Sequence, residues 1–209
     1  MNETSKIKTI FLDVGGVLLT NGWDRNARER AIKEFGLDAD DVHERHHLTF
    51  DTYEEGKLSL DGYLSRIVFY KKRPFTPEKF KEFMFSQSLP YDDMLNFIRG
   101  LKRKYDLRML TVNNEGGELN GYRIRKYKLY DFIDAFVSSC FVHFRKPDED
   151  IFRIALDISQ TPADEVVYLD DRPLFVEVAE GLGIKGIVHK DLETTKKALE
   201  DLSLTLDRT

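Results

Sequence analysis

The chain has 209 residues, of which 41% are hydrophobic and 33% are charged, and its formal net charge is -5. This composition excludes a disordered or fibrous protein, and the length allows a sizeable core with a large insertion. The acidic balance argues against nucleic acid as the main partner. The single cysteine, Cys140, excludes an intramolecular disulfide and a cysteine-based zinc site. A bound metal would therefore need oxygen or histidine ligands.

Short apolar runs alternate along the chain with stretches of helical periodicity. The runs cover residues 7–12, 107–112, 132–137, 166–169 and 184–188. Parallel strands that helices cover on both faces give this pattern, so we predict an α/β protein with a Rossmann-like parallel sheet. No signal peptide precedes the first run, and no later segment resembles a membrane span. We therefore expect a cytoplasmic protein without a membrane partner.

The stretch between the first two runs is amphipathic, rich in charged residues and free of strand signals. Thr76 followed by Pro77 marks a helix start, Ser59 marks another, and Gly36 marks a helix end. We therefore predict an all-helical cap at residues 21–90, inserted into a core that residues 1–20 and 91–209 form.

Two further groups of side chains in the predicted cap have simple structural interpretations. His43 and His47 lie one helical turn apart, with His46 beside them, and this spacing is compatible with a shared metal. No third ligand follows at a matching spacing, so we favour solvent exposure for these histidines. The phenylalanines of this segment, at positions 80, 83 and 85, are expected to pack in the core of a cap helix.

Asp13 follows the first predicted strand, where open α/β sheets place their ligand crevice. A carboxylate at this position can attack phosphorus and form an aspartyl-phosphate that water later opens. Gly15 and Gly16 follow, and glycine allows the backbone to turn sharply and to approach a phosphoryl group or metal closely. Taken alone, Asp13 is explained more simply as the start of a glycine-containing turn.

Asp170 and Asp171 follow the fourth predicted strand, and two adjacent carboxylates suit a hard cation such as Mg²⁺. An acidic turn that caps the next helix explains the pair equally well. Lys146 follows the third predicted strand, where its charge can stabilise a phosphoryl group and restrain Asp13. A solvated surface lysine is the simpler alternative. A phosphoryl dianion can bind beside carboxylates only where cations offset the repulsion between their negative charges. Mg²⁺ and Lys146 would provide these cations.

Thr111 and Asn113 lie at or just beyond the carboxyl end of the second predicted strand. They offer neutral hydrogen bonds to phosphate oxygens, and ordinary loop chemistry explains them equally well.

In their order along the chain, these segments resemble the haloacid dehalogenase superfamily of aspartyl-nucleophile hydrolases. The first motif spans residues 11–18, the second contains Leu110 and Thr111 with Asn113 close by, the third is Lys146-Pro147-Asp148, and the fourth spans residues 168–171. The helical insertion is similar to the family's cap. The resemblance implies that Asp13 is the nucleophile, that Thr111 and Lys146 contact the phosphoryl group, and that Mg²⁺ binds Asp13, Asp170, Asp171 and the backbone oxygen of Gly15. Asn113 and Gly16 would then contact the substrate.

Gly15 is the main departure from the family's pattern, because its phosphatases usually carry an aspartate there as general acid and base. Glycine cannot transfer protons, which leaves three alternatives. The substrate has an activated or anomeric phosphate, another residue such as Asp24 or Glu54 supplies the acid, or the enzyme is weak. Some members similar to sugar-1-phosphate phosphatases also carry glycine here. The segment Trp23-Asp24-Arg25 resembles theirs and makes Arg25 a candidate substrate contact.

The sequence thus predicts a Mg²⁺-dependent phosphohydrolase that acts on a small phosphorylated metabolite, with sugar phosphates among the candidates. One alternative is a 2-haloacid dehalogenase, which also uses an aspartate nucleophile but needs no metal. Another is a catalytically impaired protein that binds phosphate in a regulatory role. The sequence predicts neither the identity of the substrate nor the oligomeric state.

Overall fold

The computed structural model describes residues 6–206, so the first five and last three residues of the predicted core lie outside the described residues. Its centre is a five-stranded sheet with the order β3-β2-β1-β4-β5. All neighbouring strands pair in parallel. The strands are β1 (Thr9–Leu12), β2 (Arg108–Asn113), β3 (Ala135–Ser138), β4 (Val166–Asp170) and β5 (Lys185–Val188). The predicted α/β fold class with a Rossmann-like parallel sheet is confirmed.

The third strand begins later than the prediction of residues 132–137. A short 3-10 helix, η1 (Leu129–Asp131), precedes it, and Asp134 lies just before β3. The carboxylate of Asp134 accepts a hydrogen bond of 2.8 Å from the backbone N–H of Met109, while its own N–H donates to the Met109 carbonyl. A side chain therefore replaces a backbone partner here, and regular pairing starts only after it.

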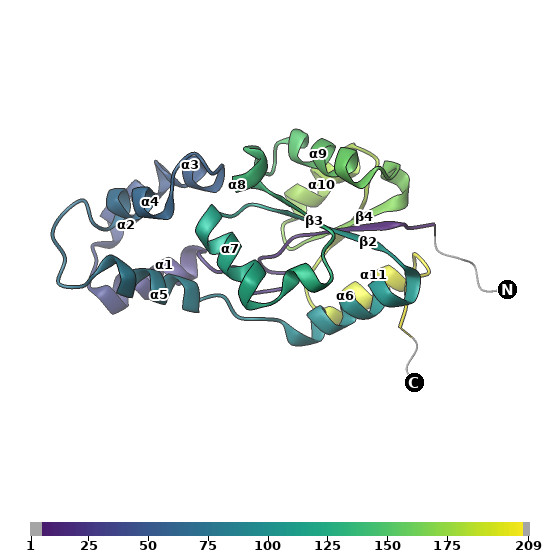
Figure 1. Ribbon diagram of the computed structural model, residues 1–209, viewed down its shortest axis with the longest axis horizontal. Coiled ribbons are helices and arrows are strands. Elements are labelled where there is room, and N and C mark those ends of the chain that lie inside the picture. The colour runs from purple at the N-terminus through teal and green to yellow at the C-terminus, as the bar shows by residue number, and fades with distance from the viewer. Residues whose placement is uncertain (1–5, 207–209) are drawn as a thin grey trace.

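Helices cover both faces of the sheet, which gives three layers (Figure 1). Helices α6 (Asp92–Tyr105) and α11 (Leu192–Glu200) lie on one face, and α9 (Glu149–Ser159) and α10 (Pro173–Gly181) lie on the other. Successive strand residues alternate between the two cores, so that Leu12 packs on the α6 side and Phe11 on the α9 side. Within residues 6–206, no helix has the length and apolar character that a membrane crossing requires.

A group of helices between β1 and β2 forms the helical cap and packs around its own apolar cluster (Figure 1). Thr76 caps α5, Ser59 caps α4, and Gly36 ends α1 with a φ of 58°, as predicted. Phe80 is buried in the cluster. The five helices are α1 (Arg25–Phe35), α2 (Ala39–His47), α3 (Phe50–Glu54), α4 (Leu60–Ile67) and α5 (Pro77–Ser86).

Helix α7 (Gly117–Lys126), which follows β2, connects the cap to the core. Its Leu119 packs in the apolar cluster of the cap, although it belongs to the predicted core segment. The limits of the cap at residues 21 and 90 remain a prediction. The short helix α8 (Ser139–Val142) follows β3, and a second 3-10 helix, η2 (Ala163–Glu165), precedes β4.

The two linkers between cap and core bind each other. The Thr20 hydroxyl donates to the Gln87 carbonyl at 2.7 Å and accepts from the Leu89 N–H at 2.9 Å. The guanidinium of Arg123 on α7 donates to the Thr20 carbonyl in the first linker and, at 3.0 Å, to the Ser88 hydroxyl in the second. One buried cation therefore fixes both ends of the cap to α7.

Candidate active site

A cavity of about 540 Å³ lies between the cap and the carboxyl ends of β1, β2 and β4. Its volume lies within the usual range for small-molecule sites. The core contributes Asp13, Lys146 and Asp171 to its lining, and the cap contributes Trp23 and Tyr63 among others. This is the crevice that the order of an open α/β sheet predicts.

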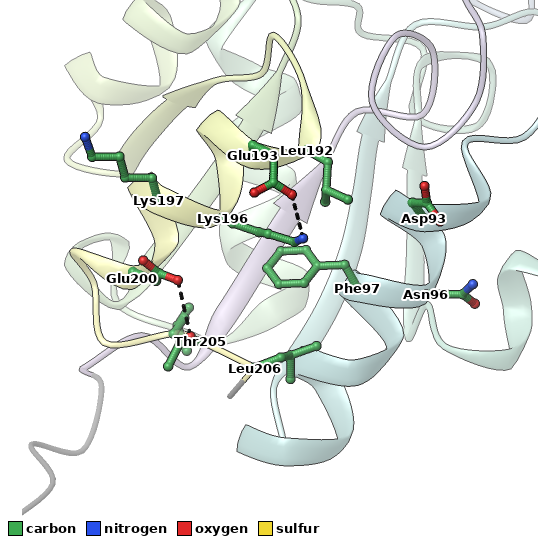
Figure 2. A pocket seen from close by; sticks show the side chains of 11 residues that line it. Asp93, Asn96, Phe97, Leu192, Glu193, Lys196, Lys197, Glu200, Thr205 and Leu206 are labelled. Atoms are coloured by element: carbon green, nitrogen blue, oxygen red, sulfur yellow. Dashed lines mark hydrogen bonds and ion pairs between the residues drawn. The ribbon is translucent and has the colours of Figure 1, made fainter. Parts of the chain in front are cut away.

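A second hollow of about 1020 Å³ lies between α6 and α11, on the side of the core formed by these two helices (Figure 2). Its lining includes Asp93, Lys196 and Glu200, and Lys196 forms an ion pair with Glu193 at 2.8 Å. None of the site residues predicted from the sequence lines this hollow. We therefore place the candidate site in the smaller cavity, where the buried titratable groups gather.

Lys146 and Asp13 meet at the floor of the cavity. The Nζ atom of Lys146 donates to Asp13 Oδ1 at 3.0 Å, to the Tyr168 hydroxyl at 2.9 Å and to Asp170 Oδ2. Only 1% of Lys146 is exposed, which rules out a solvated surface lysine. The backbone N–H of Asp13 donates to the Leu169 carbonyl at 2.9 Å, so the carboxylate is fixed at the end of β1.

The protonation of this cluster follows from its burial and its charges. Burial raises the pKa of Asp13 to about 7, because it disfavours the carboxylate more strongly than Lys146 favours it. Burial acts to lower the pKa of Lys146, but the carboxylates of Asp13 and Asp170 outweigh it and raise that pKa. Lys146 therefore stays cationic in a site that contains more carboxylates than cations.

The ligand atoms of Asp13, Asp170 and Asp171 lie within 4.8 Å of one another. One lysine cannot neutralise three carboxylates at this spacing, whereas a divalent cation with oxygen ligands would. Gly16 makes room for the cluster: its φ is +78°, and a Cβ atom there would stand 2.4 Å from Asp171 Oδ2. The residues present therefore fit a Mg²⁺ ion. Asp170 Oδ1 also accepts the N–H of Arg172 at 2.7 Å, so the expected acidic turn exists, but neither aspartate caps α10, whose N-cap residue is Arg172.

Thr111 and Asn113, which were predicted at the end of the second strand, both lie within β2. Thr111 pairs with Leu12 in the sheet, one position before Asp13, and its side chain does not line the cavity. Its buried hydroxyl has no hydrogen-bond partner among the described residues. Asn113 is also outside the lining, and its side chain binds Ser138 at 2.8 Å and Asn120 at 3.3 Å. The substrate roles of Thr111 and Asn113 remain predictions.

Asn114, in the loop after β2, lines the cavity, and no separate role was predicted for it from the sequence. Its amide binds the backbone of Lys146 in both directions, accepting the Lys146 N–H at 2.8 Å and donating to the Lys146 carbonyl at 2.9 Å. Asn114 therefore ties the loop after β2 to the loop that carries the lysine. Its place directly after Asn113 was a signal that could have identified it.

Glu115 and Arg123 form a buried ion pair that the sequence analysis missed. Arg123 Nη1 donates to Glu115 Oε2 at 2.7 Å, and both residues line the cavity. Burial raises the pKa of Glu115 to about 7 and outweighs the opposing effect of Arg123. A Cβ atom at Gly15 would lie 3.0 Å from Asn21 Oδ1 and 3.6 Å from Arg123 Nη1. The pair therefore borders the space that a side chain at position 15 would enter.

The cap residues suggested for substrate contact or acid catalysis also line the cavity. Arg25 lies at its rim with 79% of its side chain exposed. Asp24 accepts the Ala27 N–H at 2.8 Å and so caps α1. Glu54 forms an ion pair with Arg145 at 2.6 Å, which joins α3 to the loop before Lys146. Each of these three side chains thus already has a structural contact or a solvent-exposed position.

The prediction that the three cap histidines are exposed is wrong for His46. Its Nδ1 lies 2.7 Å from the Tyr63 hydroxyl, and its half-buried ring lines the cavity. Burial lowers the pKa of His46 to about 3, so the ring is neutral at pH 7. His43 is also only partly exposed and binds Glu29 at 2.9 Å, whereas His47 is exposed as expected. The hydroxyl of a buried tyrosine on α4 thus accounts for the one histidine that turns inward.

Two curated proteins are similar to parts of the chain. Flavin mononucleotide hydrolase 1 of Arabidopsis thaliana is 26% identical over 163 residues, which cover 78% of this chain and 65% of that protein. Bifunctional epoxide hydrolase 2 of Sus scrofa is 32% identical over 113 residues, which cover 53% of this chain and 20% of that protein. The chain therefore spans less than two thirds of either relative.

Solved structures share the fold. A HAD family enzyme from Bacteroides thetaiotaomicron, in complex with magnesium and inorganic phosphate, matches 88% of this chain and 94% of its own, with a TM-score of 0.75 and 20% identity. L-2-haloacid dehalogenase from Xanthobacter autotrophicus matches 93% of this chain and 83% of its own, with a TM-score of 0.61 and 16% identity. The model of the haloacid dehalogenase-like hydrolase family matches residues 7–183, most of the chain. The chain therefore belongs to the haloacid dehalogenase-like hydrolases.

Proposed function

We propose that the protein is a Mg²⁺-dependent phosphohydrolase that acts on a small phosphorylated metabolite through an aspartyl-phosphate at Asp13. The observation that carries the proposal is the buried contact of Lys146 with Asp13 and Asp170, beside Asp171, on the floor of a cavity that the cap covers. The similarity to a flavin mononucleotide hydrolase, and the fold shared with an enzyme that binds magnesium and phosphate, support the same chemistry.

The proposed reaction assigns a role to each residue of the cluster. A carboxylate oxygen of Asp13 attacks phosphorus, the bond to the leaving oxygen breaks, and water later opens the aspartyl-phosphate. Lys146 orients the attacking carboxylate and places a positive charge near the phosphoryl oxygens. Asp13, Asp170, Asp171 and the backbone oxygen of Gly15 would hold Mg²⁺, which offsets phosphate charge when it is bound. Asn113, Thr111, Gly16 and Arg25 remain candidate contacts of the phosphoryl group or substrate.

The test is a phosphate-release screen with Mg²⁺ over sugar phosphates, nucleotides, acyl phosphates and flavin mononucleotide. We expect release from at least one substrate, loss of release with a chelator, and loss in Asp13→Asn. A protein that binds inorganic phosphate but hydrolyses no member of the panel would instead be a phosphate-binding or regulatory protein, which is the alternative that Gly15 raises.

Two observations are compatible with the dehalogenase alternative, namely Gly15 and the fold shared with L-2-haloacid dehalogenase. The three clustered carboxylates argue against it, since without a metal they would repel the carboxylate of a 2-haloacid. Chloride release from a 2-haloacid in the presence of a chelator would decide in favour of the dehalogenase.

A further inference from the structure

We propose that Glu115 is the general acid and base that position 15 does not supply. This inference rests on the proposed phosphohydrolase function and adds a catalytic residue to it. Its basis is that Glu115 lines the cavity and is paired with Arg123, which borders the side-chain position of residue 15.

Arg123 connects the Glu115 carboxyl group to the vacant side-chain position at residue 15. One nitrogen of Arg123 lies 3.6 Å from the point where a Cβ atom of residue 15 would stand and 2.7 Å from Glu115 Oε2. A single guanidinium nitrogen of Arg123 thus lies between the Glu115 carboxyl group and the position of a Cβ atom at residue 15. The loop after β2 therefore brings a carboxyl group towards the region that an aspartate at position 15 would reach from the loop after β1.

The structure holds Glu115 firmly in this place. The residue is 7% exposed, and its backbone N–H donates to the Ser139 hydroxyl at 3.0 Å. It follows Asn114, whose amide binds the backbone of Lys146. Glu115 is thus positioned by the same loop that fixes the lysine against Asp13. Asp24 and Glu54, by contrast, belong to the cap, where they cap α1 and bind Arg145.

The surroundings allow Glu115 to carry a proton near neutral pH. Burial is the largest effect and favours the neutral acid, whereas Arg123 favours the carboxylate. A carboxyl group that titrates near the working pH can donate a proton in one step and accept one in the next. The charged and titratable groups that act on Glu115 or sense its charge are Arg123 on α7, Glu54 and Tyr53 on α3, Tyr63 on α4, Asp13 after β1 and Cys140 on α8.

The two proton transfers balance over the cycle. In the first step, a carboxylate oxygen of Asp13 bonds to phosphorus, the phosphorus–oxygen bond of the ester breaks, and the Glu115 carboxylic acid gives its proton to the departing oxygen. In the second step, a water oxygen bonds to phosphorus, the bond to Asp13 breaks, and the Glu115 carboxylate takes a proton from that water. The products are the alcohol and inorganic phosphate, and Glu115 and Asp13 return to their starting states.

The first experiment compares a poor and a good leaving group. In Glu115→Gln, kcat with ethyl phosphate should fall by about 10²-fold or more, whereas kcat with p-nitrophenyl phosphate should fall less than about 10-fold, because a stabilised leaving group needs little protonation. Glu118→Gln makes the same chemical change at an exposed residue of α7 outside the cavity, where the amide oxygen can still accept the Leu60 N–H, and should leave both rates unchanged. An equal loss on both substrates in Glu115→Gln, or no loss, would overturn the inference.

A second variant tests the shared space directly. Adding Gly15→Asp to Glu115→Gln should restore much of the rate on ethyl phosphate, because the new carboxyl group would enter the space beside Arg123. A double variant that folds, by its thermal unfolding midpoint, but is no faster than Glu115→Gln would contradict the shared location.

Infrared difference spectra provide a readout that does not depend on turnover. Because the pKa of Asp13 is also raised to about 7, the spectra are recorded in the Asp13→Asn background. A carboxyl C=O band that titrates near neutral pH should remain in Asp13→Asn, be absent after adding Glu115→Gln and be retained after adding Glu118→Gln. Persistence of the band in Asp13→Asn with Glu115→Gln would overturn the inference. If the unmodified protein releases phosphate from no substrate, both the proposed function and this inference fail; if it does and only the leaving-group contrast is missing, the inference alone fails.

Discussion

The Nζ atom of Lys146 lies 3.0 Å from Oδ1 of Asp13, and both side chains are buried at the carboxyl end of β1. This contact makes the carboxylate available in a single orientation towards the cavity. We expect Asp13→Asn to lower phosphate release by at least about 10³-fold, because the amide oxygen is a far weaker nucleophile. The thermal unfolding midpoint should change little, because Lys146 keeps Asp170 as its partner. Release at the original rate would exclude the aspartyl-phosphate mechanism.

Removal of the lysine should affect stability as well as activity. In Lys146→Met, Asp13 and Asp170 lose their shared cation, and breaking a buried pair of this kind costs about 3 kcal/mol or more. Urea unfolding at pH 7 measures this loss. The matched control is Lys57→Met, since Lys57 forms an exposed pair with Glu55 at 2.8 Å, and the free energy of unfolding should change by less than about 1 kcal/mol. Equal effects of the two substitutions would contradict the structural role of the buried pair.

Gly16→Ala should disrupt the acidic cluster specifically. The new methyl group would lie 2.4 Å from Asp171 Oδ2 and displace that carboxylate, so Mg²⁺ affinity measured by calorimetry should fall by about 10-fold or more. Gly36→Ala is the control, because Gly36 has a similarly positive φ of +58° but no atom within 4 Å of the added methyl group. It should cost only the backbone strain of about 1 kcal/mol and leave Mg²⁺ affinity unchanged.

Two arginines of the cap should contribute unequally to substrate binding. Arg28 lines the cavity, half-buried and held by a 2.7 Å hydrogen bond to the Trp23 carbonyl, whereas Arg25 stands exposed at the rim. A charged contact is stronger where water is excluded, so Arg28→Ala should raise KM by about 10-fold and Arg25→Ala by about 3-fold or less. The KM of the best substrate from the screen checks this order, and the reverse order would assign the main contact to Arg25.

His46 should make stability depend on pH. Its pKa is about 3 in the folded protein and near 6.5 when unfolded, so below pH 6.5 the unfolded chain binds a proton that the folded chain does not. The stabilising contribution is therefore complete above pH 6.5 and decreases as the pH falls towards 3, by up to about 1.4 kcal/mol per pH unit. Urea unfolding between pH 7 and 5 should show a shallower decline in His46→Gln than in the exposed control His47→Gln. Identical slopes would contradict the burial of His46.

The architecture was predictable because burial on both faces leaves a strong signal in strand composition. The sequence predicted five strands and a helical insertion, with the caps of α1, α4 and α5, since glycine, serine and threonine act locally at helix ends. The start of β3 was not predictable, because it depends on the Asp134 carboxylate accepting the Met109 N–H of β2 in place of a backbone carbonyl.

The candidate site was predictable only in part, because some of its contacts join residues that are distant in the sequence. The carboxyl ends of parallel strands meet at one edge, so Asp13 and the aspartates after β4 were expected together, and the structure shows Lys146 among them. The ion pair of Glu115 and Arg123 joins a loop to a helix, and the spacing of the two residues in the sequence does not predict such a contact. The depth of Thr111 likewise follows from the register of β1 against β2, which composition does not specify.

The adjacency of the two cap linkers has an evolutionary consequence. Thr20 and Leu89 exchange hydrogen bonds, so the chain leaves the core and returns to it at almost the same point. An insertion whose two ends lie side by side does not require the strands of the core to move, and insertion of domains with adjacent ends is readily tolerated. Caps of other lengths and shapes can therefore be accepted at this point while the strand ends that carry Asp13 and Asp171 stay in place, and the lining of the cavity can change without any change in its floor.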